Sequence, residues 1–198
     1  MPACSSLDEI LEVDIPGAVQ DSDLSDPRLA ATLARSAQND FECGFAEFIN
    51  WSGVWTSELQ DLGGGRPDNL LQTRASSYNF YADPCGGTSP NYAPLQTGRG
   101  MGRLAFDILS QHEASEVVGD LEQMLASSKL YEAYAIELLS ETYCAVTLGT
   151  SSNGSEPYEP PDGGPLKTRG EGLRIAEELF GVAIEHAARV ANATEATR

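Results

Sequence analysis

The chain has 198 residues, 41% of them hydrophobic, which suffices for one domain with a sizeable core and excludes wholesale disorder. Thirty acidic residues against twelve basic ones give a formal net charge of −18, and the only lysines are Lys129 and Lys167. Because such a surface repels phosphate groups, we expect neither nucleic-acid binding nor charge-driven attachment to anionic membranes. No apolar run is long enough to span a bilayer.

The first residues resemble a lipoprotein lead. "MPACSSLDEILEVDIPG" places Cys4 after a small residue and before two serines and a short polar stretch. A mature bacterial lipoprotein begins in this way, with the lipid on the cysteine, although an incidental cysteine explains the pattern equally well. We therefore expect residues 1–26 to be a lead and residues 27–198 to form a single domain.

The first helix is predicted to start with Asp26 as the N-cap and Pro27 at the first helical position. Apolar residues then recur at helical spacing, with a bend at Ser52-Gly53 and an end at Gly63-Gly64-Gly65. These residues are Leu29, Leu33, Ala37, Phe41, Phe45, Phe48, Ile49, Trp55 and Leu59.

At about 100° per residue, the phenylalanines of this helix share one stripe, and Cys43 and Val54 fall nearly opposite it. A helix that is apolar on two sides is buried on two sides. We therefore expect it to be the central helix, with its aromatic residues in the core rather than in a sugar-binding platform.

Residues 66–94 show little periodicity and are predicted to form a long loop, with a short helix near "DNLLQTRAS". A second helix is predicted in "NYAPLQTGRGMGRLAFDILSQ", with Pro94 in its first turn. Gly98 and Gly102 lie on one face of it, and each costs about 1 kcal/mol of helix stability relative to alanine. Close approach of another helix would compensate for that cost.

A third helical region is predicted from Val117 to Leu148, with a break near Ser127-Ser128 into a short and a long helix. The loop "TSSNGSEPYEPPDGGPLKTRG" separates it from the last helix, "GLRIAEELFGVAIEHAARVA". No segment alternates as a strand does. The predicted class is all-α, made of helical hairpins with long loop insertions.

Two of these helices carry spacing typical of a tetratricopeptide unit. Ala176, Phe180 and Ala183 have its small–large–small pattern, and Leu139-Ser140-x-x-Tyr143 resembles part of its first helix. Small residues would allow close helix approach, with Phe180 and Tyr143 filling the groove between the helices. An ordinary helical hairpin explains the spacing nearly as well.

The cysteines do not predict a metal site. Cys43, Cys85 and Cys144 are far apart and form no CxxC pair, which argues against zinc. In an exported protein two of the three would form a disulfide, and we slightly favour Cys144 over Cys85 as the partner of Cys43. In a reducing cytosol all three would be small buried hydrophobic residues.

Motifs for catalysis or cofactor binding are not found in the sequence. There is no nucleophile elbow, metalloprotease motif or phosphate-binding loop. His112 and His186 have no partner at the spacing of a catalytic triad or metal site, so we expect both to be residues at helix ends or flanks. We expect a non-enzymatic protein without a cofactor.

Several segments, in order, resemble the N-terminal part of the SusD/RagB family of nutrient-uptake lipoproteins. They are "CSSLDEILEVDIPG", "DPRLAATLARSAQNDFECGFAEFINWSGVWTSELQD", "YAPLQTGRGMGRLAFDIL", "YEAYAIELLSETYCAV" and "DGGPL". The resemblance implies a helical, tetratricopeptide-like scaffold with a lipid on Cys4, exported to the outer membrane and exposed at the cell surface. It also implies non-enzymatic capture of glycans or other nutrients for a TonB-dependent transporter.

Members of that family are usually much longer, so we expect either a fragment or a shortened relative. A shortened relative would be better explained as a helical accessory subunit that binds a partner protein in an extracellular or periplasmic assembly.

A glycan site, if present, is expected in the loop before the second helix, where aromatic rings stack on sugars and amides bind hydroxyls. The candidate residues are Tyr78, Asn79, Tyr81, Asn91 and Tyr92. The alternative, which we favour, is that these tyrosines fix the long loop to the helices.

Overall fold

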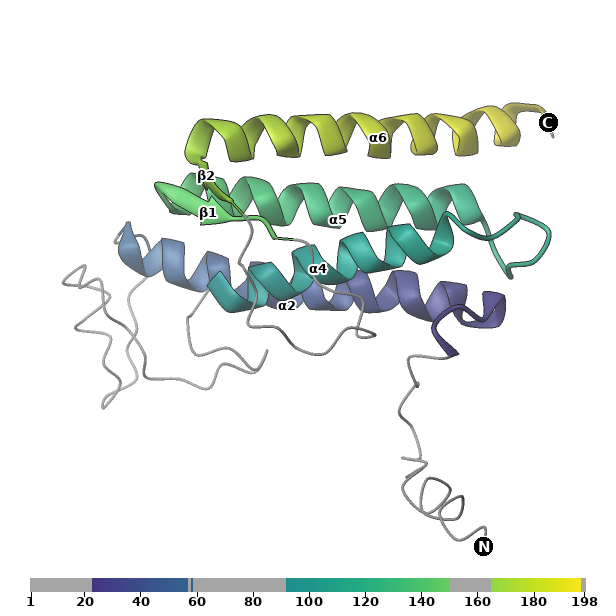
Figure 1. Cartoon of the computed structure of the whole chain (residues 1–198), viewed down its shortest axis with the longest axis horizontal. Coiled ribbons are helices and arrows are strands. Elements are labelled where there is room, and N and C mark those ends of the chain that lie inside the picture. Colours follow the sequence, from purple (N-terminus) through teal and green to yellow (C-terminus); the bar gives the residue numbers. More distant parts are fainter. Residues whose placement is uncertain (1–22, 57, 59–91, 150–164, 197–198) are drawn as a thin grey trace, which may run out of the picture.

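The computed structural model describes residues 23–56, 58, 92–149 and 165–196. Its long elements are the helices α2 (Ala30–Trp55), α4 (Tyr92–Leu109), α5 (Leu121–Thr142) and α6 (Arg169–Ala196). They run up and down along a common direction, with α2 and α4 on one side of α5 and α6 on the other (Figure 1). The all-α class predicted from the sequence is therefore confirmed.

The start of the first helix follows the predicted signals. An Asp26 carboxylate oxygen accepts a hydrogen bond from the backbone N–H of Arg28 at 2.9 Å, and Pro27 opens a 3-10 turn, η2 (Pro27–Leu29), that leads into α2. The helix continues through Ser52-Gly53 and ends at Trp55. The predicted end at residues 63–65 is therefore wrong, since the helix stops before Thr56. The short helix predicted near "DNLLQTRAS" lies outside the described residues.

The central helix is α5, and the expectation that α2 would be central is wrong. Helix α5 contacts α2, α4 and α6, whereas α6 packs mainly on α5. Helix α5 has buried residues along its whole length, from Leu121 and Leu125 at its start to Ile136 and Leu139 near its end. The helix was harder to recognise because small and polar residues, Ser128 and Ser140 among them, occupy some of its fully buried positions.

The expected close approach at the α4 glycines is confirmed, but each glycine meets a different helix. A Cβ on Gly98 would lie 2.8 Å from the Cα of Phe41 in α2. A Cβ on Gly102 would lie 2.8 Å from the carbonyl oxygen of Ser128 and from the amide nitrogen of Glu132 in α5. Helix α4 is thus wedged between α2 and α5 at backbone contact distance.

Helix α5 is continuous, so the predicted break at Ser127-Ser128 is wrong. The two serines serve packing and local hydrogen bonding instead: Ser128 is fully buried against Gly102, and the Ser127 hydroxyl donates to the carbonyl of Met124 at 3.0 Å. The helix begins at the N-cap Asp120, whose carboxylate accepts from the N–H of Gln123 at 3.1 Å.

A short antiparallel ribbon corrects the expectation that no strand is present. Strands β1 (Ala145–Thr147) and β2 (Leu166–Thr168) join the end of α5 to the start of α6, with Val146 opposite Lys167. Three residues per strand are too few for a period-two pattern to be visible in the sequence. Val146 is 1% exposed and packs into the core with Leu139.

The core has two parts along the bundle axis. One contains small residues of α2, such as Ala30 and Ala37, packed with Leu109 and Leu121. The other is aromatic: the Phe41 ring lies 5.2 Å from those of Tyr131 and Tyr134 in α5. Phe41 is 4% exposed, so the prediction that this residue belongs to the core is confirmed.

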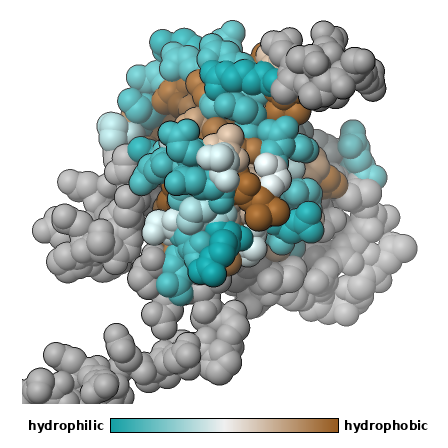
Figure 2. Space-filling view, turned by 90° about the vertical axis from the view of Figure 1, so that its right-hand side faces the viewer, coloured by the Kyte–Doolittle hydropathy of each residue, from teal (hydrophilic) through white to brown (hydrophobic). Residues whose placement is uncertain are grey.

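Seen from the end where α2 begins and α6 ends, hydrophobic residues form separate patches among hydrophilic ones (Figure 2). Val118, in the turn between α4 and α5, is one of several exposed large hydrophobic residues. In the described part of the chain, no helix is both long and apolar enough to cross a membrane.

Candidate functional site

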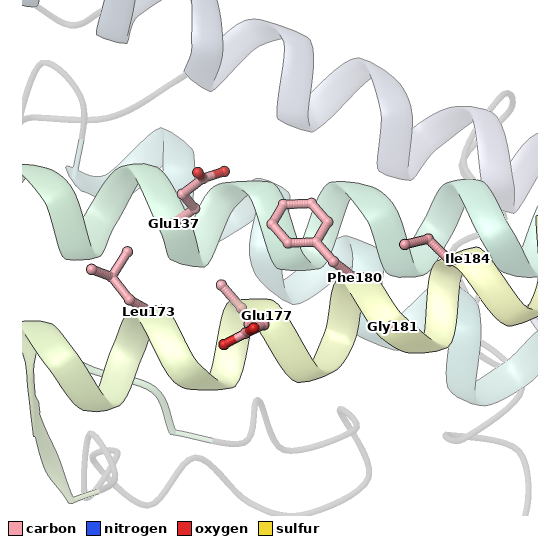
Figure 3. Close-up of a pocket in the computed structure, with 7 residues that line it drawn as sticks. Glu137, Leu173, Glu177, Phe180, Gly181 and Ile184 are labelled. Carbon is pink, nitrogen blue, oxygen red and sulfur yellow. The ribbon is translucent and has the colours of Figure 1, made fainter.

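The candidate functional site is a groove of about 410 Å³ between α5 and α6. Leu173, Phe180 and Ile184 follow one another along α6 on the side of the groove, and Glu137 projects from α5 (Figure 3). Ile184 is 68% exposed and Phe180 is half-buried, so part of this apolar lining faces solvent. The described residues that line it are Glu137, Leu173, Ala176, Glu177, Phe180, Gly181 and Ile184.

The spacing of small residues on α6 produces this groove. Ala176 and Ala183 face α5 and are 2% and 5% exposed, while Gly172 lies against Ser140 of α5. These small contacts bring the two helices close together. The larger Phe180 is therefore displaced to the flank of the helix pair, where it lines the groove.

The predicted role of Tyr143 is corrected by the structure. Tyr143 is the C-cap of α5, and its ring packs edge-on to that of Tyr92 at a centroid distance of 5.1 Å. It therefore contacts α4 rather than filling the space between α5 and α6. Phe180 does line that space, as the spacing predicted.

The groove is acidic. Burial, followed by repulsion from Glu141, raises the pKa of the Glu137 carboxyl above its usual range. Glu177 adds a second carboxylate from α6, and none of the described residues that line the groove is basic. An apolar surface flanked by carboxylates favours a ligand that is both apolar and cationic.

Aromatic rings connect the groove to the core of the bundle. The ring of Phe180 lies 6.5 Å from that of Tyr134 in α5, which lies 5.6 Å from Phe45 in α2. Phe48 follows at 6.5 Å from Phe45. These contacts form a row of rings from α2 across α5 to α6. All four side chains are half-buried.

Among the residues predicted to bind glycans, the structure describes Tyr92. Its hydroxyl lies 3.0 Å from that of Thr147 in β1, and its ring contacts Tyr143. These contacts indicate that Tyr92 joins α4 to the ribbon. The other candidates, Tyr78, Asn79, Tyr81 and Asn91, and the proposed lipid site Cys4, lie outside the described residues.

The favoured disulfide is wrong. Cys144 is an exposed free thiol next to β1. Cys43 in α2 is disulfide-bonded, and its partner lies outside the described residues, as does Cys85. Cys144 lies in the turn that leads from α5 into β1. It is therefore not carried by a helix, as the favoured pairing with Cys43 expected.

A buried charged cluster lies between α4 and α5. Lys129 and Glu132 have the i,i+3 spacing of a helical ion pair, but the sequence did not indicate that the pair would be buried. Lys129 Nζ lies 2.6 Å from a Glu132 carboxylate oxygen and 4.0 Å from the centre of the Phe106 ring. Arg99 is 8% exposed and donates to the side chain of Gln96 and the carbonyl of Gly149. Burial lowers the pKa of Arg99. These bonds join α4, α5 and the end of the ribbon.

His186 has a partner that its sequence neighbours did not indicate. Its Nδ1 lies 2.6 Å from a Glu122 carboxylate oxygen in α5, and Arg189 donates to the same oxygen at 3.1 Å. Burial disfavours the charged carboxylate, but these hydrogen bonds outweigh it and lower the pKa of Glu122. The residues are 64 positions apart, so sequence spacing carries no signal for the pair.

Comparison of the chain with protein-family models, with curated proteins and with solved structures gave no match. The function is therefore argued from the residues and geometry of this chain.

Proposed function

We propose that this chain is the helical scaffold of a non-enzymatic, SusD/RagB-like surface lipoprotein that captures glycans or other nutrients for a TonB-dependent outer-membrane transporter. The observation that carries this proposal is the α5–α6 pair, in which Ala176 and Ala183 are buried against α5 and Phe180 lies at the flank. The close packing of these small residues on α5 is the part of the tetratricopeptide-like pattern that supports a scaffold of this kind.

Further support comes from the order of the resembling segments and from the cysteines. The helical segments quoted for the resemblance coincide with α2, α4 and α5, and the short "DGGPL" segment precedes α6. A disulfide at Cys43 suits an oxidising compartment, as expected for an exported protein. In this proposal Cys4 carries the lipid and the loop that contains Tyr78 and Tyr81 contacts the nutrient.

Mass spectrometry of the protein isolated from its native membrane tests the anchor. We expect Cys4 to be the first residue and to carry acyl chains; an unmodified Cys4 preceded by its native residues would contradict the proposal.

Chemical crosslinking in the same membranes tests the partner, and we expect a TonB-dependent transporter to be crosslinked to the chain. Glycan binding by the wild type and by Tyr78→Ala and Tyr81→Ala variants tests capture. Equal binding of every glycan by all three proteins would exclude the loop as the capture site.

A second candidate function is favoured by the groove itself. In this alternative the chain is a helical accessory subunit that binds a partner protein in an extracellular or periplasmic assembly. The specific observation is the apolar row on α6, in which Leu173 and Phe180 are half-buried and Ile184 is exposed. Grooves beside repeat-like helix pairs commonly bind protein segments.

A further inference from the structure

We infer that the groove between α5 and α6 binds an amphipathic helix of a partner protein, with its apolar stripe on Leu173, Phe180 and Ile184 and basic residues beside Glu137 and Glu177. This inference rests on the partner-binding function proposed above and specifies the chemistry of the partner. Among the predicted site residues that the structure describes, namely Cys43, Tyr92 and Cys144, none lines this groove.

The shape of the groove fits a helix. The three apolar residues lie at positions i, i+7 and i+11 of α6, so they share one face over about three helical turns. A partner helix of similar length laid alongside would contact all three with residues spaced three or four apart. A Cβ on Gly181 would meet nothing within 4 Å, so this position leaves room between Phe180 and Ile184 for a side chain of the partner.

The charges select a basic helix. Glu137 is half-buried, and its burial, followed by repulsion from Glu141, raises its pKa. Glu141 lies one turn further along α5, and Glu177 stands on the opposite helix. A lysine or arginine of the partner placed here would relieve the repulsion between Glu137 and Glu141. The net charge of −18 would also accelerate the encounter with a cationic partner.

The same charges disfavour two other occupants. A second copy of the chain would bring another charge of −18 to an already acidic surface. An anionic membrane would be repelled in the same way, even though Ile184 is exposed. A basic amphipathic helix satisfies both the apolar row and the carboxylates.

The test uses the full chain and two synthetic helical peptides of about fourteen residues with the same leucine stripe. One peptide carries lysines on both flanks, and the other carries glutamates at the same positions. Binding is measured by fluorescence anisotropy at low and high salt. We expect the lysine peptide to bind, with an affinity that falls as salt is added. Its affinity should exceed that of the glutamate peptide by at least roughly tenfold.

Two variants locate the binding. Ile184→Ser replaces an exposed apolar side chain and should lower the affinity for the lysine peptide by roughly tenfold. Glu137→Gln with Glu177→Gln should lower the affinity for the lysine peptide by a similar factor and reduce the salt dependence of binding. Val118→Ser is the matched control for an exposed aliphatic residue, and Glu113→Gln with Glu116→Gln, in the turn between α4 and α5, is the control for charge. Both controls should bind as the wild type does.

Unchanged peptide binding in the two groove variants, or equal binding of both peptides by the wild type, would overturn the inference. So would a concentration-dependent dimer that Ile184→Ser abolishes, because the occupant would then be a second copy. A chain that binds neither peptide, yet is still crosslinked to a membrane transporter, overturns this inference and leaves the proposed function intact. Peptide binding through the groove, with no crosslink to a transporter, supports this inference and contradicts nutrient capture for a transporter.

Discussion

Ser140 of α5 and Gly172 of α6 meet so closely that a methyl group on residue 172 would overlap the Ser140 hydroxyl. The Ser140 hydroxyl is fully buried and has no hydrogen-bond partner among the described residues. This contact fixes the distance between the two helices that form the groove. It therefore links the packing of small residues to the candidate site.

Gly172→Ala should lower the free energy of unfolding by about 1–3 kcal/mol, because the added methyl group overpacks the contact with Ser140. Urea unfolding monitored by circular dichroism provides the measurement. Gly181→Ala is the control, since it meets open space on the same helix and should stabilise by up to about 1 kcal/mol.

Adding Ser140→Ala to Gly172→Ala should recover most of that loss, because the nearest clashing atom is the Ser140 hydroxyl oxygen. Ser140→Ala alone should be neutral or stabilising, since it removes a buried hydroxyl without a described partner. Strictly additive effects of the two substitutions would show that the contact does not set the helix spacing.

Lys129→Met should destabilise the chain by about 3 kcal/mol, because it leaves the Glu132 carboxylate buried without the ammonium group that binds it at 2.6 Å. Arg99 still attracts Glu132, which limits the loss. The double variant Lys129→Met with Glu132→Met should lose less than the single variant, since both charges leave the core together. Urea unfolding of the wild type, Lys129→Met and the double variant measures this, and a double variant that loses as much stability as Lys129→Met would contradict it.

The stabilisation from Glu122 should be lost in acid. His186 and Arg189 lower the folded-state pKa of Glu122 below the ordinary value of 4.5. Its contribution is therefore fully present above pH 4.5 and disappears as the pH falls through the folded-state pKa. Unfolding free energies of the wild type and Glu122→Gln should differ at about pH 5.5 and converge as the pH falls through the folded-state pKa. A gap that widens toward acid would contradict the assigned direction.

Tyr92→Phe should lower the free energy of unfolding by about 1 kcal/mol, because it removes the hydrogen bond to Thr147 that ties α4 to β1. Thr147→Val removes the other partner, and the double variant should cost less than the two single losses combined. Glycan binding should be unchanged in all three proteins. A selective loss of glycan affinity without a loss of stability would restore Tyr92 as a ligand-binding residue.

Local signals in the sequence predicted the elements well where those signals were complete. Asp26 followed by Pro27 marks the start of the first helix, and the helical repeat of alanine, leucine and phenylalanine identifies α2 as a packed helix. The spacing of Ala176 and Ala183 correctly predicted close packing of α6 on α5. These properties depend on residues within a few turns of one another.

The errors arose where a local signal had a tertiary purpose. Ser127-Ser128 predicts a break, although α5 runs through both residues and Ser128 is fully buried where the α5 backbone meets Gly102 of α4. Tyr143 was assigned to the space between α5 and α6, but the turn after α5 directs it toward Tyr92. The three-residue strands were invisible because neither is stable without the other.

The sequence by itself determined the all-α class, the close approach at Gly98 and Gly102 and the strongly acidic surface, since each follows from composition or short-range periodicity. Tertiary structure alone decided that α5 is central, that His186 pairs with Glu122, and that Leu173, Phe180 and Ile184 lie beside Glu137. Contacts between separate helices depend on the angles and distances at which those helices pack. Small buried residues such as Gly172 set those distances, and their partners are far away in the sequence.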